Sequence, residues 1–116
     1  MGNKVKVQTQ VLIDEIIKSS EYTDFISLKA AIVQDKEIFN NVNKYRKHLF
    51  ELQCLQATTD VNQYDAITEL NANYEQLLSR PAVSDFMKAE LKLTKLISSV
   101  FDEITQGLEM DLEFLA

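Results

Sequence analysis

The stretch from Ser19 to Phe39, SSEYTDFISLKAAIVQDKEIF, decides the fold because it holds two helical patterns with no Gly or Pro between them. Apolar side chains recur at helical spacing from Tyr22 to Val33. Ser20 and Asp35 precede the two patterns, and their side-chain oxygens can accept hydrogen bonds from the free N–H groups at a helix start. The sequence therefore predicts a helix capped by Ser20 and another capped by Asp35. The alternative is one continuous helix through Asp35.

The clearest pattern outside this stretch is an apolar seam in a helix expected to run from Asp35 to about Gln56. Its residues alternate by four and three, which is typical of a helix that packs along one side; they are Ile38, Val42, Tyr45, Leu49 and Leu52, with Phe39 and Phe50 widening the seam. Another helix is expected to open at a capping Asp60 and run to Leu78. The short break between the two helices predicts an antiparallel hairpin.

Pro81 predicts the start of the last helix, because the first turn tolerates a residue without an N–H, and Gly107 is the expected C-cap. The apolar arc of this helix is wider than one neighbour could cover, which predicts burial among several helices or in an oligomer. With a first helix from about Gln8, the chain is predicted to be all-α. We expect about five helices in an oligomer-forming bundle, with a long antiparallel hairpin and a long C-terminal helix. The expected divisions are a flexible lead-in at 1–7, a single helical domain at 8–108 and an acidic apolar tail at 109–116.

Composition limits the class of protein. The 116 residues include 46% hydrophobic residues, 2 Gly and 1 Pro, and carry a formal net charge of −6. The acidic balance argues against nucleic acid as the main partner, because phosphate binding requires a basic surface. No apolar run is long enough for a membrane span, and the N-terminus lacks the apolar segment of a signal peptide. We therefore expect a cytoplasmic protein with no membrane contact.

The residues that usually carry chemistry are sparse. The chain has one histidine, His48, and one cysteine, Cys54, with no Glu-x-x-His pair and no Gly-rich phosphate loop. The carboxylates of Asp14–Glu15 and Asp102–Glu103 are adjacent in sequence, so on a helix they point about 100° apart and do not converge. The expectation is a protein that is not an enzyme, with no catalytic residues, cofactor, metal or small-molecule substrate.

Two sets of residues are candidates for contacts with other proteins. The set expected to mediate self-association is Phe39, Val42, Tyr45, Leu49, Phe86 and Leu93. A basic cluster of Lys44, Arg46 and Lys47 is either a solvated helix face, with Glu51 paired to Lys47, or a docking patch for an acidic protein or RNA. The final residues, GLEMDLEFLA, have three interpretations: a fraying helix end on the core, a contact between subunits, or a short motif for another protein.

Two segments carry a resemblance to a known family. They are SSEYTDFISLKAAIVQDKEIFNNVNKYR (19–46) and LSRPAVSDFMKAELKLTKLISSVFDEI (78–104), and together they resemble the YlbF/YmcA/YheA family of small helical bacterial proteins. In the first segment the matching positions are Ser19, Glu21, Tyr22, Leu28, Asp35 and Glu37. In the second they are Arg80, Pro81, Val83, Phe86, Ala89, Glu90, Leu93, Ile97 and Ile104. The resemblance covers roughly residues 8–108.

The resemblance implies a non-enzymatic, all-α cytoplasmic regulator that forms a homodimer or higher oligomer. It implies an adaptor in competence, sporulation and biofilm formation, acting with related small helical proteins in a complex that modulates a phosphorelay and RNA processing by an endoribonuclease. Some members carry a cysteine-rich C-terminal tail linked to an iron–sulfur cluster. Because this sequence has Cys54 alone, no cluster is carried over. The alternative function is a nucleic-acid-associated protein that uses Lys44, Arg46 and Lys47.

Overall fold

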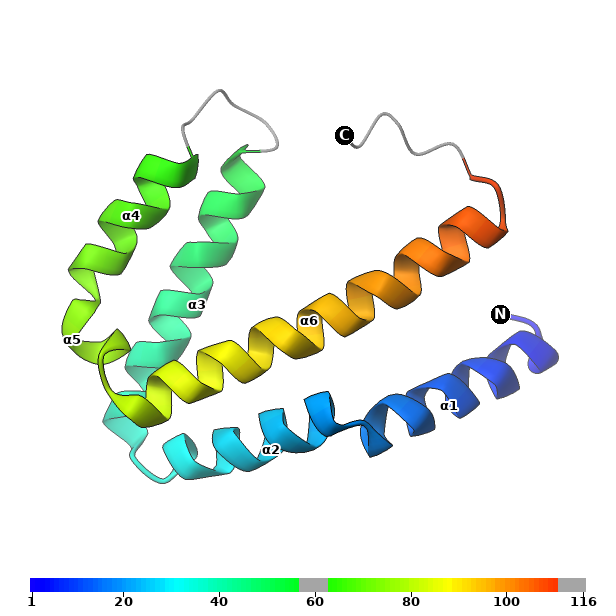
Figure 1. The fold of residues 1–116 in the computed structure, drawn as a ribbon, viewed down its shortest axis with the longest axis horizontal. Coiled ribbons are helices and arrows are strands. Elements are labelled where there is room, and N and C mark those ends of the chain that lie inside the picture. The colour runs from blue at the N-terminus through cyan, green and yellow to red at the C-terminus, as the bar shows by residue number, and fades with distance from the viewer. Residues whose placement is uncertain (57–62, 111–116) are drawn as a thin grey trace. The chain divides into compact units, whose positions relative to one another are not determined.

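The computed structural model describes residues 1–56 and 63–110 of the chain. Within these ranges there are six α-helices and no strand (Figure 1), which confirms the all-α prediction. The helices are α1 (Asn3–Lys18), α2 (Ser20–Val33), α3 (Lys36–Gln56), α4 (Gln63–Asn73), α5 (Glu75–Leu78) and α6 (Pro81–Gly107). None of the described helices combines the length and hydrophobicity needed to cross a bilayer.

The chain divides into two compact units with different degrees of burial. Unit 1 comprises Met1–Ile26 with Lys88–Ala116, and unit 2 comprises Ser27–Met87. The buried apolar side chains of unit 2 form its core; they are Ile32, Val42, Tyr45, Leu70, Val83 and Phe86. In the described part of unit 1 only Ala89 and Thr105 are buried, and neither is a large apolar residue. The hydrophobic core of the described chain is therefore in unit 2.

A single residue, Ser19, joins α1 to α2. Its N–H donates to the carbonyl of Ile16 at 3.0 Å, and its hydroxyl donates to the same carbonyl at 2.6 Å. The Ser19 Oγ also accepts from the N–H of Tyr22 at 3.2 Å, which is the N-cap contact of α2. The prediction of Ser20 as the cap was wrong by one residue. Both serines have the chemistry of a cap, but Ser19 has the extended backbone (φ −70°, ψ 154°) that the position requires.

Asp35 caps α3 as predicted. Its Oδ1 accepts from the N–H of Glu37 at 3.1 Å and from that of Ile38 at 3.2 Å. Since α2 ends at Val33 and α3 begins at Lys36, the alternative of one helix running through Asp35 was wrong. The chain bends at both joints through a side-chain oxygen instead of a glycine.

We expect Asp35→Ala to lower the free energy of unfolding by about 1 kcal/mol, because two N–H groups at the start of α3 lose their acceptor. Urea denaturation followed by circular dichroism measures the change. Asp102→Ala is the matched control, since it removes the same charge from an exposed position within α6. An equal loss in both variants would show that the cap contributes nothing specific.

Some helix boundaries differ from those expected. The first helix begins at Asn3 instead of Gln8, because residues 3–8 contain no helix-breaking residue even though they lack an apolar stripe. The helix expected to end at Leu78 is interrupted at Tyr74, whose backbone (φ −109°, ψ 19°) separates α4 from α5. The predicted cap Asp60 lies outside the described residues. The number of helices therefore exceeds the expected five by one.

The end of α6 is closed by Glu109 instead of the predicted Gly107. Glu109 has a positive φ of 54°, while Gly107 is the last helical residue. The N–H of Met110 donates to the carbonyl of Thr105 at 3.0 Å, and the N–H of Glu109 donates to that of Gln106 at 3.0 Å. This pair of bonds is the Schellman arrangement, which usually has a glycine at the left-handed position. Of the expected tail at 109–116, residues 111–116 lie outside the described part of the chain.

Helices α3 and α4 of unit 2 form the predicted antiparallel hairpin (Figure 1). Across it the Tyr45 hydroxyl donates to Asn71 Oδ1 at 2.7 Å. The Tyr45 ring also meets the Tyr74 ring edge to face, with centroids 5.4 Å apart. These contacts fix the register of α3 against the helices that follow it.

Candidate interaction surfaces

The residues predicted for self-association fall into two groups. Val42, Tyr45 and Phe86 are 0%, 6% and 0% exposed and form part of the core of unit 2. Phe39, Leu49 and Leu93 are half-buried and keep some accessible surface. Burial within one chain gives the first group a structural role, so self-association through this set remains a prediction that depends on the second group.

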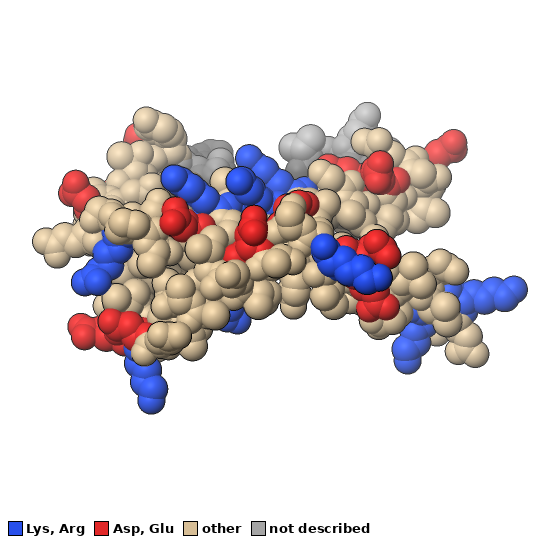
Figure 2. Space-filling view, turned by 60° about the horizontal axis from the view of Figure 1, so that its bottom comes forward, with Lys and Arg blue, Asp and Glu red and all other residues tan. Residues whose placement is uncertain are grey.

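The three basic residues of α3 differ in their surroundings. The Arg46 guanidinium lies 5.5 Å from the centre of the Phe86 ring and donates to Asn43 Oδ1 at 3.0 Å. Lys47 Nζ lies 4.0 Å from Glu51 Oε1, with side chains 75% and 59% exposed, so the pair contributes at most about 0.5 kcal/mol. Lys44 is exposed. The face of the molecule in Figure 2 has Lys and Arg side chains interspersed with Asp and Glu. Docking through this cluster remains a prediction.

Tyr45 is a titratable residue whose environment is changed by folding. Burial raises the pKa of its phenol above the usual value of about 10. The fold therefore favours the neutral form, which also donates the hydrogen bond to Asn71. This contribution to stability is fully present below the unfolded-state pKa of about 10 and is lost as the pH rises through the folded-state pKa.

Tyr45→Phe is expected to lower the free energy of unfolding by about 1 kcal/mol at pH 8, because the hydrogen bond to Asn71 is lost. Above pH ~10 the difference in free energy of unfolding between wild type and variant should shrink. The unfolded wild type then loses the phenol proton, which the folded wild type retains, so only the wild type becomes less stable as the pH rises. Urea midpoints of both proteins at pH 8 and at high pH test this. A difference that does not change with pH would contradict the assigned burial effect.

Large apolar side chains are exposed mainly in unit 1. In unit 2 the described exposed ones are Val33, Phe50 and Tyr64. In unit 1 they include, on α1, Val5, Val7, Val11, Ile13 and Ile17, on α6, Leu91, Ile97, Phe101 and Ile104, and, directly after α6, Leu108. Large exposed apolar patches are typical of interaction sites, so unit 1 is the candidate interaction region of the described chain.

Four of these residues form a regular stripe, here called the α6 stripe. Ile97, Phe101, Ile104 and Leu108 are spaced by four, three and four residues, and they are 51%, 54%, 49% and 67% exposed. This spacing places Ile97, Phe101 and Ile104 along one side of α6, as in the seam of a coiled coil, and Leu108 follows in the turn directly after Gly107. The wide apolar arc of this helix was predicted from the sequence, but the residues chosen from it for self-association were Phe86 and Leu93. The spacing of these four residues by four, three and four was the feature of the sequence that could have predicted the stripe.

Charges are segregated along the unit 1 portion of α6. Its first part carries the exposed Lys88, Lys92 and Lys95, together with Glu90. Its second part and the following turn carry Asp102, Glu103 and Glu109, with no Lys or Arg from 96 to 110. A helix with this distribution is basic at one end of its apolar stripe and acidic at the other.

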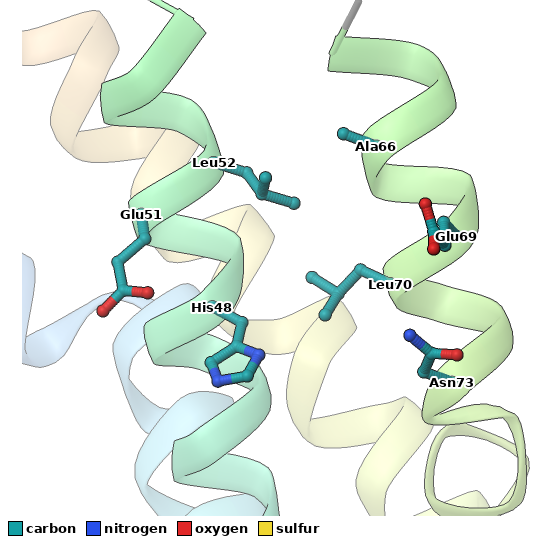
Figure 3. A pocket seen from close by; sticks show the side chains of 7 residues that line it. All are labelled: His48, Glu51, Leu52, Ala66, Glu69, Leu70 and Asn73. Carbon is teal, nitrogen blue, oxygen red and sulfur yellow. The ribbon is translucent and has the colours of Figure 1, made fainter. Parts of the chain in front are cut away.

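Each unit also has a hollow between helices. In unit 1 the start of α2 and the middle of α6 line a space of about 440 Å³, with Ser20, Glu21 and Asp24 on one side and Lys92, Lys95, Leu96 and Ser99 on the other. In unit 2 a groove of about 490 Å³ lies between α3 and α4 (Figure 3). Neither hollow was predicted from the sequence, because each is lined by residues of two different helices.

The sequence of the chain matches a known protein family over most of its length. Residues 5–109 match the family model described as control of competence regulator ComK, YlbF/YmcA. The chain belongs to the YlbF/YmcA family. A relative of this YlbF/YmcA protein, a UPF0342 protein of Desulfitobacterium hafniense (strain Y51), is 29% identical over 92 residues, which cover 78% of this chain and 73% of the relative. No solved structure matched the chain.

Membership of the YlbF/YmcA family confirms the resemblance found in the sequence. The match includes the α6 stripe and the α3–α4 hairpin, so the family assignment applies to both units. The family is described by the control of a regulator.

Proposed function

We propose that this YlbF/YmcA protein is a non-enzymatic cytoplasmic regulator of competence that acts as an adaptor through protein–protein contacts of unit 1. The proposal rests on the many large apolar side chains that are exposed in unit 1. Among the described residues of this unit, no large apolar side chain is buried. Burial of such side chains stabilises an assembly by about 25 cal/mol per Å² of apolar surface removed from water. Roles in sporulation and biofilm formation are further predictions from the resemblance.

The first partner of unit 1 is a second copy of the chain. The regular spacing of the α6 stripe suits packing against an equivalent stripe, and twofold pairing is the commonest form of self-association. Antiparallel pairing sets the basic part of each α6, from Lys88 to Lys95, beside the acidic part of the other, from Asp102 to Glu109. Parallel pairing sets like charges side by side. These exposed charges select orientation more than they add affinity.

Related small helical proteins are the second class of partner, because a member with a similar stripe can replace one copy of this chain. Exchange of subunits between relatives gives an adaptor a means of bringing different surfaces into one complex. In this scheme the protein acts by forming a complex, and the regulated protein is bound by that complex.

A genetic replacement tests the proposed function. The chromosomal gene is exchanged for one encoding Phe101→Asp, and the amount of the competence regulator is measured alongside a gene deletion. Phe101→Asp should match the deletion, because a charge in the α6 stripe opposes its burial. The control is Phe50→Asp, which changes an aromatic residue of unit 2 that is 65% exposed; this strain should behave as wild type. Normal regulator levels in the deletion strain would refute the proposal.

A further inference from the structure

The groove between α3 and α4 of unit 2, here called the α3–α4 groove, is a second candidate surface. It has no role in the self-association proposed for unit 1. His48, Glu51 and Leu52 line it from α3, and Ala66, Glu69, Leu70 and Asn73 line it from α4 (Figure 3). All seven of these described residues lie within unit 2. Its volume of about 490 Å³ is large enough for several side chains of a partner.

The floor of the groove is apolar and follows the helices. Figure 3 shows the side chains of Leu52, Ala66 and Leu70 pointing into the gap between α3 and α4. Leu70 is 7% exposed and forms the base, while Leu52 and Ala66 are half-buried. From Ala66 to Leu70 the apolar floor extends about one helical turn, on the order of 6 Å. An apolar channel of this length between two helices suits the ridge of a third helix.

The rim of the groove is acidic on both walls. Glu51 stands on the α3 wall and Glu69 on the α4 wall, and both are exposed. No Lys or Arg is among the lining residues. The exposed Lys47, 4.0 Å from Glu51, is held too weakly to block a competing cation. His48 on α3 and Asn73 on α4 lie at the same end of the groove, on opposite sides of it, where they can bond to polar groups of an occupant.

We infer that the α3–α4 groove binds an amphipathic helix of a partner protein whose apolar ridge is bordered by Lys or Arg. The ridge packs on Leu52, Ala66 and Leu70, and the flanking cations reach Glu51 on one side and Glu69 on the other. Charge complementarity selects a basic helix over an acidic one, and the apolar floor selects a helix with one apolar face. The inference concerns unit 2 alone and does not depend on self-association through unit 1.

A labelled 18-residue peptide tests this inference, with leucines along one helical face and lysines on its flanks. Fluorescence anisotropy at physiological salt measures its affinity for the full-length protein. The Glu51→Lys/Glu69→Lys variant is expected to bind roughly tenfold more weakly or worse, because attraction at both walls becomes repulsion. Ala66→Trp, which fills the floor, should weaken binding similarly; circular dichroism melting checks that this variant is folded.

Matched controls decide between the groove and other causes of binding. Asp14→Lys/Glu15→Lys changes the net charge of the protein by the same amount at exposed positions in unit 1 and should leave peptide affinity unchanged. An equal loss in this control would show attraction to net charge only and overturn the inference. Phe101→Asp should also retain binding, and a loss there would place the peptide on the α6 stripe. Equal affinity for a peptide with glutamate in place of lysine would likewise overturn it.

Discussion

Replacing Phe86 with alanine is expected to lower the free energy of unfolding by about 3–5 kcal/mol, which is a large part of the stability of an ordinary domain. Phe86 is 0% exposed and is one of the largest fully buried side chains of the described chain. Removal of its ring leaves a cavity among the core residues of unit 2. It also takes away the face on which the Arg46 guanidinium rests, 5.5 Å from the ring centre. The cavity and the lost contact with Arg46 both lower the free energy of unfolding.

Thermal and urea denaturation followed by circular dichroism measure the effect of Phe86→Ala. Phe50→Ala is the matched control, because it deletes the same group from a helix position that is 65% exposed. The control should change stability by no more than about 0.5 kcal/mol. Similar losses in the two variants would mean that Phe86 is not part of a packed core.

Phe101→Asp is expected to abolish self-association in solution. The wild-type protein should sediment as a species larger than the 13.3 kDa single chain, and the variant should sediment as the single chain. Phe101 lies in the middle of the α6 stripe, so in an assembly the introduced carboxylate would be desolvated without a partner. A penalty of about 3 kcal/mol raises the dissociation constant roughly 100-fold or more.

Sedimentation equilibrium over a range of concentrations measures this change in assembly. Phe50→Asp introduces the same charge at an exposed aromatic position of unit 2 and should assemble as the wild type does. A wild-type protein that remains a single chain at high concentration would refute self-association. Assembly retained by Phe101→Asp would instead move the interface away from the α6 stripe.

The features of the fold that depend on neighbouring residues in sequence were the most predictable. Asp35 was identified as a cap because its carboxylate acts on N–H groups two and three residues away. The choice between Ser19 and Ser20 failed because both carry the same hydroxyl, and only the backbone conformation distinguishes them. The hairpin followed from two apolar helices with a short break. The interruption at Tyr74 had no Gly or Pro to signal it.

The interaction surfaces were less predictable because they depend on which side of a helix the chain itself covers. Periodicity revealed the seam of α3 but not its width, so Phe50 was expected beside the seam and is 65% exposed. On α6 the arc was recognised, yet the buried Phe86 and the exposed Phe101 belong to the same apolar pattern. The α3–α4 groove combines residues from two helices, and no single segment of sequence contains it.

The joints at Ser19 and Asp35 have a consequence for how this chain can evolve. Both bends depend on a side-chain oxygen, and in the described backbone only Glu109 among the non-glycine residues has a positive φ. Loss of those oxygens leaves no Gly or Pro at either bend to prevent straight continuation. A substitution at Ser19 or Asp35 therefore removes the local signal that starts the next helix, and tertiary packing alone then holds the bend. We expect both positions to accept only Ser, Thr, Asp and Asn without loss of stability, because these side chains supply the same acceptor.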